Sequence, residues 1–316
     1  MSAGKHFHYV LCLSEAKGMD IKMKKKIKKF LHNFYKGAYA VGYRHVSDKA
    51  THFDNTLPFE VLEPTLHRWY ADSFPFVENG REYIFVEIMD DANGEKGTIG
   101  VIDLQDNKGF VEIINEPFHM SFPNTFKFEN DIYMMPETSE ANQLRLYKAV
   151  DFPYKWEMQS VLYDGIAVVD TVFVKTEDNI MYAVGQKLPE KKNVLFKIDT
   201  NTWKAEIAAL KGNYVDKRPA GNFIQYDNGI YHALQECGRV YGEYLHLCKL
   251  DSFDGETLQE RETDTYSVSD MTINSKRNYR RVHTLNKMGN LEVIDLLYYQ
   301  FNPTILLEKV KRAIKK

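Results

Sequence analysis

Three carboxylates stand at similar places in repeated stretches of the sequence and could do acid–base chemistry. Asp72 lies in "ADSFPF", Glu137 ends "IYMMPE" and Asp170 lies in "VVDTVF". Making or breaking a glycosidic bond needs a carboxylic acid that protonates the departing oxygen and a carboxylate that serves as base or nucleophile. Carboxylates that converge in a partly dry pocket raise the pKa of at least one of them, as a general acid requires. We therefore take these three residues as candidate catalytic groups.

Polar residues near these carboxylates would complete a binding site. The candidate substrate-binding residues are Glu87, His119, Ser121, Arg218, Gln235, Tyr241 and His283. Aromatic side chains such as Trp69 and Phe74 would stack on a sugar ring while charged groups bind its hydroxyls. Taken singly, an Asp or Glu at a strand end more often caps a loop, so the case depends on agreement between several repeats. No metal-ligand spacing is present, and we expect neither a metal nor a cofactor.

The elements that carry these residues recur along the chain. An apolar strand, a short turn rich in Asn, Asp or Gly, and a second aromatic strand form a hairpin signal. The five turns are centred on Asn79, Asn130, Asp178, Asn228 and Gly289. A period of about 50 residues accommodates four strands in each unit. The pattern predicts an all-β, five-bladed β-propeller rather than a sandwich, whose turns recur without a higher period.

Hairpin geometry then gathers the polar residues at one rim. The start of the first strand and the end of the second lie side by side, opposite the turn. Asp72 and Glu87 are roughly equidistant from the turn at Asn79. The matching sets in later units are His119 or Ser121 with Glu137, Asp170 with Gln186, Arg218 with Gln235, and His283 with Asp295. We therefore expect all five blades to offer polar groups at one mouth of a central channel.

Composition narrows the classes of partner. Across 316 residues, 41 basic and 44 acidic side chains give a formal charge of -3, so no whole-chain field favours nucleic acid. The three cysteines suggest neither a disulfide framework nor a zinc site. There is no secretory signal pattern and no apolar run near the ~20 residues that a membrane span needs. These features predict a cytoplasmic protein.

Both termini carry basic, amphipathic stretches. "IKMKKKIKKFLHNF" (21–34) places its apolar residues on one helical face and its lysines around the rest, and "NPTILLEKVKRAIKK" (302–316) repeats the pattern. Such helices either bind an anionic membrane surface, beside a lipid-linked glycan, or pack on the outside of the propeller. We predict an N-terminal extension (1–45), the propeller (46–302) and a C-terminal basic helix (303–316).

Several segments together resemble a known family. "RWYADSFPF", "HMSFPNTF", "VVDTVFV" and "VHTLN" are similar to the propeller-like N-terminal region of glucosamine inositolphosphorylceramide transferases and their stand-alone bacterial relatives, from Trp69 to Asp295. More remotely, the chain resembles the five-bladed propellers of arabinanases, β-xylosidases, invertases and levansucrases, and Asp72 falls where these keep an essential first-blade Asp. The resemblance implies a carbohydrate-directed site, often in bacterial surface-polysaccharide settings.

Three functions fit these observations. The first is an enzyme that forms or exchanges glycosidic bonds in surface-polysaccharide assembly, acting on a carbohydrate or a sugar nucleotide. The second is a glycoside hydrolase of the arabinanase or invertase type. The third is a non-catalytic glycan-binding propeller that partners a separate glycosyltransferase.

Overall fold

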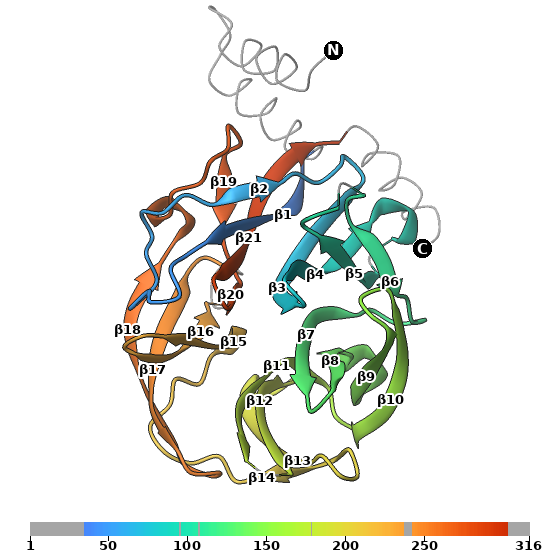
Figure 1. Ribbon diagram of the computed structural model, residues 1–316, viewed down its shortest axis with the longest axis vertical. Helices are drawn as coiled ribbons and strands as arrows, with labels where there is room; N and C mark the ends of the chain where they lie inside the picture. Colours follow the sequence, from blue (N-terminus) through green and yellow to red (C-terminus); the bar gives the residue numbers. More distant parts are fainter. Residues whose placement is uncertain (1–34, 95, 107, 178, 237–241, 303–316) are drawn as a thin grey trace, which may run out of the picture. The chain divides into compact units, whose positions relative to one another are not determined.

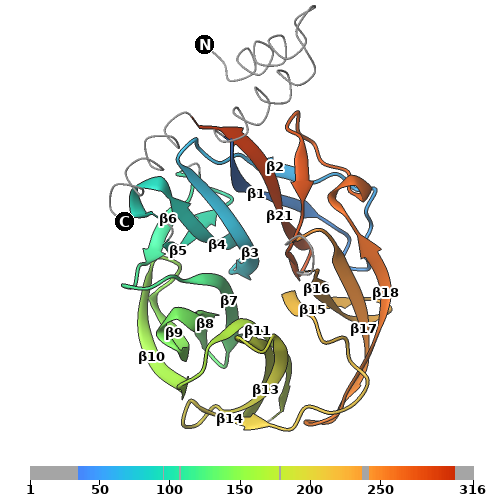
Figure 2. The same ribbon diagram turned by 180° about the vertical axis from the view of Figure 1, so that it is seen from behind.

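Five β-sheets are arranged around a central axis within the compact unit Tyr39–Tyr298 (Figures 1 and 2). This computed structural model describes residues 35–302 except 95, 107, 178 and 237–241. Each sheet is one blade, and its strands follow one another from the axis outwards. The predicted all-β, five-bladed propeller is therefore confirmed.

Blades 1 to 4 are antiparallel sheets of four consecutive strands. Blade 1 contains β3 (Arg68–Glu78), β4 (Arg81–Asp90), β5 (Gly97–Asp103) and β6 (Val111–Ile114), and blade 2 contains β7 (Ser121–Phe128), β8 (Asp131–Glu137), β9 (Gln143–Asp151) and β10 (Lys155–Asp164). Blade 3 contains β11 (Val168–Glu177), β12 (Ile180–Lys187), β13 (Lys192–Asp199) and β14 (Lys204–Ala208), and blade 4 contains β15 (Arg218–Tyr226), β16 (Gly229–Gln235), β17 (Leu245–Phe253) and β18 (Leu258–Tyr266).

Blade 5 is built from two distant parts of the chain. Its strands are β19 (Tyr279–Arg281), β20 (Leu285–Met288), β21 (Leu291–Phe301), β1 (Tyr35–His45) and β2 (Glu60–Leu62). Both β19 and β20 pair with β21, and β21 in turn pairs with β1. The predicted boundary at residue 46 is thus wrong for β1, because its backbone completes the sheet that β21 begins.

The predicted hairpins are the inner two strands of each blade. Asn79 and Gly80 both have positive φ between β3 and β4, which matches the twist of a tight hairpin. Gly289 has a φ of 59° in the turn between β20 and β21. Asp178 lies outside the described residues. Strand β4 is buried without interruption from Tyr83 to Ile88, because apolar clusters cover both of its faces.

Helical structure in the described residues is limited to three short 3-10 turns: η1 (Asp91–Asn93), η2 (Ser139–Ala141) and η3 (Val268–Asp270). The predicted basic helices at 21–34 and 303–316 lie outside the described residues. Within the described ranges, no helix has the length and apolar character needed to cross a membrane.

Candidate active site

The inner strands of the first three blades carry bulges at corresponding positions. In β3, the pairing with β4 skips from Ala71 to Phe74 and leaves Asp72 with a φ of 50°. Equivalent skips in β7 and β11 leave Phe122 and Asp170 with φ of 48° and 51°. A bulge re-aims side chains, and non-glycine residues with positive φ concentrate at functional sites.

The last two blades carry broader interruptions. In β15 the pairing skips from Pro219 to Phe223, and Gly221 has a φ of 146°. A Cβ there would lie 2.1 Å from the carbonyl oxygen of Leu285, so only glycine fits. In blade 5 the inner strand is divided, and His283 lies between β19 and β20. The corresponding positions around the axis therefore hold Asp72, Phe122, Asp170, Gly221 and His283.

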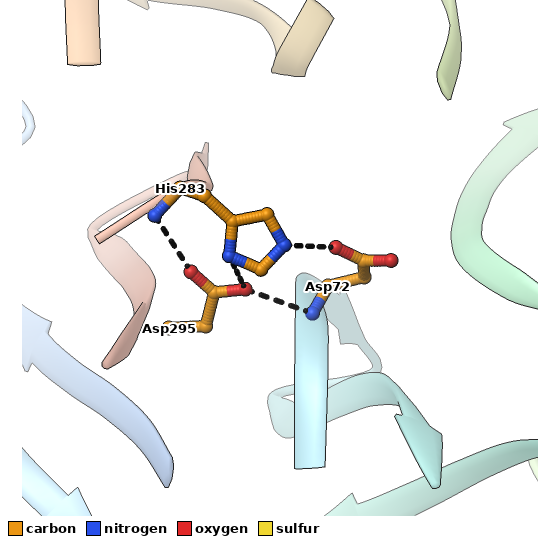
Figure 3. Close-up of side chains that lie close together, drawn as sticks. All are labelled: Asp72, His283 and Asp295. Atoms are coloured by element: carbon orange, nitrogen blue, oxygen red, sulfur yellow. Dashed lines mark hydrogen bonds and ion pairs between the residues drawn. The ribbon is translucent and has the colours of Figure 1, made fainter. Parts of the chain in front are cut away.

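Asp72, His283 and Asp295 form a buried cluster between blades 1 and 5 (Figure 3). The Oδ1 atom of Asp72 lies 3.0 Å from Nε2 of His283. On the other side of the imidazole, Nδ1 lies 2.8 Å from Oδ2 of Asp295. Each ring nitrogen of His283 thus faces a carboxylate, as expected for an imidazolium.

The charges in this cluster set its ionisation. Burial alone would lower the pKa of His283, but the carboxylates of Asp295 and Asp72 raise it to about 10. Burial alone would raise the pKa of Asp72, but His283, and also Arg218, hold it below its usual range. Asp72 is therefore ionised at neutral pH.

Asp295 also fixes the backbone around the cluster. Its Oδ2 accepts a hydrogen bond from the backbone N–H of Asp72 at 3.1 Å. Its Oδ1 accepts from the backbone N–H groups of His283 and Thr284 at 3.1 and 3.0 Å. Asp295 is fully buried, and these hydrogen bonds join the bulge of β3 to the segment between β19 and β20. We therefore assign it a structural role.

An aromatic residue from β1 completes this side of the site. The ring of Tyr39 lies 4.8 Å from that of His283 and 5.6 Å from that of Trp69, centroid to centroid. Burial, followed by the charges of Asp295 and Asp72, raises the pKa of Tyr39. The sequence analysis missed Tyr39 because it assigned β1 to an extension outside the propeller.

A second cluster joins blades 2, 3 and 4. The guanidinium of Arg218 donates to both oxygens of Asp170, at 2.5 and 2.9 Å, and to Oε2 of Glu137 at 3.4 Å. The amide of Gln235 donates to Oδ2 of Asp170 at 2.8 Å. Oε1 of Glu137 accepts from the hydroxyl of Ser139 at 2.7 Å. Arg218 thus brings together two of the predicted catalytic carboxylates.

Burial dominates the ionisation of this second cluster. It raises the pKa of Glu137 to about 8, with Arg218 opposing it and Asp170 adding to it. Burial likewise raises the pKa of Asp170 against the charge of Arg218. Asp72 contributes to both shifts, which places the two clusters within electrostatic reach of each other.

Glu87 and His119 form a third polar pair, at the rim of blades 1 and 2. Oε1 of Glu87 lies 3.3 Å from Nε2 of His119. The backbone N–H of Gly97 donates to Nδ1 of the same imidazole at 2.9 Å. Burial and then the charges of Asp72 and Glu137 raise the pKa of Glu87 well above its usual range. Glu87 and His119 thus lie within electrostatic reach of Asp72 and Glu137.

Three further predicted residues have different outcomes. Ser121 is buried and pairs in register with Glu137. Phe74 does not line the mouth: it is buried in the core, with its ring 4.7 Å from that of Phe122. Tyr241 lies outside the described residues.

A polar network lies on the turn side of the bulges. The side-chain amide of Asn286 donates to the carbonyl of Ser73, and its oxygen accepts from the backbone N–H of Asn222. Asn222 donates in turn to Asn124, which donates to the carbonyl of Thr171. These bonds connect the inner strands of all five blades and hold the bulges in place.

Asp72, His283 and Asp295 can present ligand atoms within 4.8 Å of one another, the spacing of a metal site. Both imidazole nitrogens already face carboxylates, and a metal would have to displace one of them. We therefore describe the group as a charge-paired triad.

An outer groove of about 590 Å³ lies between blades 3 and 4, lined by residues that include Tyr182, Lys197, Glu206 and Asp254. None of the clusters described above reaches it. Buried ionisable groups with shifted pKa values mark functional sites, so we place the candidate site at the mouth.

The sequence profile of the family described as "Glucosamine inositolphosphorylceramide transferase 1, N-terminal" matches residues 64–295. This range covers most of the chain, all strands of blades 1 to 4, the inner strands of blade 5 as far as Asp295 and every residue of the three clusters. The chain belongs to this family.

Individual relatives agree with this assignment. Glucosamine inositolphosphorylceramide transferase 1 of Arabidopsis thaliana is 30% identical over 207 residues, which cover 61% of this chain and 27% of that protein. The protein of the same name from Oryza sativa subsp. indica is 29% identical over 205 residues, with 60% and 27% covered. The chain thus spans about a quarter of the length of the curated relatives it matches.

Two enzymes are among the solved structures with a similar fold. An exo-1,5-α-L-arabinanase from a bovine ruminal metagenomic library has a TM-score of 0.46 and 12% identity, covering 74% of this chain and 95% of that one. A β-xylosidase/α-arabinofuranosidase from a compost microbial metagenome, in complex with xylotriose, has a TM-score of 0.49 and 12% identity, with 75% and 92% covered.

Proposed function

We propose that the protein is a carbohydrate-active enzyme that forms or exchanges glycosidic bonds at this mouth. One observation carries the proposal: an ionised carboxylate, Asp72, shares the site with buried glutamic acids whose pKa is raised. When their surroundings give two carboxyl groups different pKa values, the group with the raised pKa can act as the acid and the ionised group as the base. Membership in a transferase family supports the same class of chemistry.

In the proposed reaction, Asp72 takes the proton of an incoming hydroxyl as that oxygen bonds to the anomeric carbon. A protonated glutamic acid gives its proton to the departing oxygen. Arg218 is held between Asp170 and Glu137, where its positive charge keeps the two carboxyl groups together. Asp170 is then the group that orients Arg218, rather than the base.

We place the substrate among glycans or sugar nucleotides and the setting in surface-polysaccharide assembly. Two alternatives use the same mouth. A hydrolase would use water as the incoming hydroxyl. A glycan-binding propeller would leave the chemistry to a separate glycosyltransferase.

Products decide among these functions. The full chain is incubated with a panel of arabinosides, xylosides, glucosaminides and UDP-sugars, with and without glycan acceptors, and the products are read by mass spectrometry. We expect new, longer glycans. Free sugar alone would instead establish hydrolysis, and binding by calorimetry without any product would establish the non-catalytic reading.

We further propose that the protein works in the cytoplasm at an anionic membrane surface, through the basic stretches 21–34 and 303–316. Each Lys or Arg near such a surface contributes about 1 kcal/mol. The full chain is expected to sediment with phosphatidylserine vesicles at low salt and to be released at high salt. Equal recovery with neutral phosphatidylcholine vesicles would contradict this proposal.

A further inference from the structure

Glu87 and Glu137 differ in the groups that face their carboxyl oxygens. Glu137 accepts from the Ser139 hydroxyl on one oxygen and from the Arg218 guanidinium on the other. Both contacts favour its ionised form. In the described part of the chain, the only polar side chain in contact with Glu87 is the imidazole of His119. Glu87 is therefore the better placed of the two to keep a proton.

The hydrogen bonds of His119 select its tautomer. The backbone N–H of Gly97 can only donate, so Nδ1 of His119 must be an acceptor with a free lone pair. The ring proton of the neutral imidazole then sits on Nε2, which faces Oε1 of Glu87 at 3.3 Å. A doubly protonated ring would direct an N–H at the Gly97 amide. The contact with His119 thus brings Glu87 a neutral donor. The positive charge of His283 also favours the ionised form of Glu87, but this imidazolium is paired with Asp72 and Asp295.

The backbone fixes the position of this imidazole. The N–H of His119 donates to Oε2 of Glu140 at 2.8 Å, and the N–H of Met120 donates to the carbonyl of Gly97 at 3.1 Å. A Cβ on Gly97 would lie 2.6 Å from Oε1 of Glu87 and 2.9 Å from Cε1 of His119. A glycine is therefore required where the backbone, imidazole and carboxyl group meet.

Glu87 also stands beside the ionised group of the site. It pairs in register with Ala71, the residue before Asp72, so both carboxyl groups belong to one hairpin of blade 1. Diagonal neighbours in such a pair lie within reach of long side chains. Glu87 is buried, and the negative charges of Asp72 and Glu137 oppose its ionisation.

We propose that Glu87 is the proton donor of this site and that His119 is its positioning residue. This inference depends on the proposed function. As the bond between the anomeric carbon and the departing oxygen breaks, its electron pair moves to that oxygen, which takes the Glu87 proton. The incoming hydroxyl oxygen bonds to the anomeric carbon and gives its proton to Asp72. Glu137 stays with Arg218 and binds substrate.

Infrared difference spectroscopy of the full chain in D2O tests the protonation without a substrate. A protonated carboxyl group has a carbonyl stretch that an ionised one lacks. We expect the wild-type band that persists to the highest pH to vanish in Glu87→Gln. It should persist in Glu137→Gln and in the control Glu82→Gln, which changes a carboxylate at the other end of β4.

One result would overturn the protonation of Glu87, and a second would overturn the positioning role of His119. One is a high-pH carboxyl band that survives in Glu87→Gln. The other, independent of that variant, comes from two-bond ¹H–¹⁵N NMR of the wild type. We expect the Nε2–H tautomer for His119, and an Nδ1–H or doubly protonated ring at neutral pH would contradict the positioning role.

Turnover tests the donor role. Nitrophenolate departs without protonation, whereas an alkoxide does not. Glu87→Gln should therefore lower turnover of methyl glycosides by about 10²- to 10⁴-fold and change that of 4-nitrophenyl glycosides far less. An equal loss on both, or none, would overturn the donor role alone. If the wild type turns over neither glycosides nor UDP-sugars, the proposed function fails and the donor role with it, whatever the infrared spectra show.

Discussion

Replacing Asp72 with asparagine is expected to lower turnover by about 10²- to 10⁴-fold while the protein stays folded. Asparagine is isosteric and tolerates positive φ better than most residues, so the bulge at 50° survives. The substitution removes the negative charge that would accept the incoming proton and that also faces His283, whose second partner Asp295 remains in place. Steady-state kinetics on a substrate found by the product screen would measure the loss.

The matched control for this variant is Asp103→Asn. Asp103 is also a buried aspartate of blade 1, but it pairs with Arg81 near the hairpin turn, at the opposite end of the blade from the mouth. The Asp103→Asn variant changes the net charge by the same amount as Asp72→Asn and should leave turnover unchanged. Wild-type turnover in Asp72→Asn would rule out Asp72 as the base.

The second large effect is expected for Asp295→Asn. Removing one partner of a buried ion pair costs about 3–5 kcal/mol of the free energy of unfolding. The pKa of His283 should fall from about 10, because Asp295 is the largest contributor that raises it. Urea denaturation measures the first change, and NMR titration of the His283 ring measures the second.

The pH dependence of this effect has a defined sign. The pKa of His283 is about 10 in the folded protein against an ordinary value of 6.5, so the folded state binds the proton more tightly. The resulting stability is fully present below about pH 6.5 and is lost as the pH rises towards 10. The difference in unfolding free energy between the wild type and Asp295→Asn should shrink over that range.

Glu292→Gln separates this effect from a general loss of stability. Glu292 is fully buried on the same strand, β21, where it pairs with Arg44 and accepts from the hydroxyl of Tyr226. Its replacement should also destabilise the fold but leave the pKa of His283 near 10. A His283 ring that titrates equally in both variants would refute the role assigned to Asp295.

The sequence predicts the hairpins, the number of blades and the common rim, because each depends on local signals that recur along the chain. We took Phe74 as a sugar-stacking residue at the mouth, and on a regular strand it would share a face with Asp72, two places before it. The bulge at Asp72 breaks this alternation and turns Phe74 into the core. Local alternation alone does not reveal where a bulge falls.

Contacts between the ends of the chain are not predictable in this way either. Asp295 stands in the largely apolar run "LEVIDLLYY", and a carboxylate there signals a buried polar partner without identifying it. Its partners include Asp72, more than half the chain away in sequence. Tyr39 reaches His283 only because β1 joins the last blade.

Blade 5 draws its strands from both ends of the described chain, and this affects how the protein is made. Asp72 leaves the ribosome long before His283 and Asp295 do, and β1 has no sheet to join until β21 has been synthesised. A chain that ends before Asp295 cannot assemble the triad. The candidate site therefore arises only after β21 has been synthesised and has joined β1.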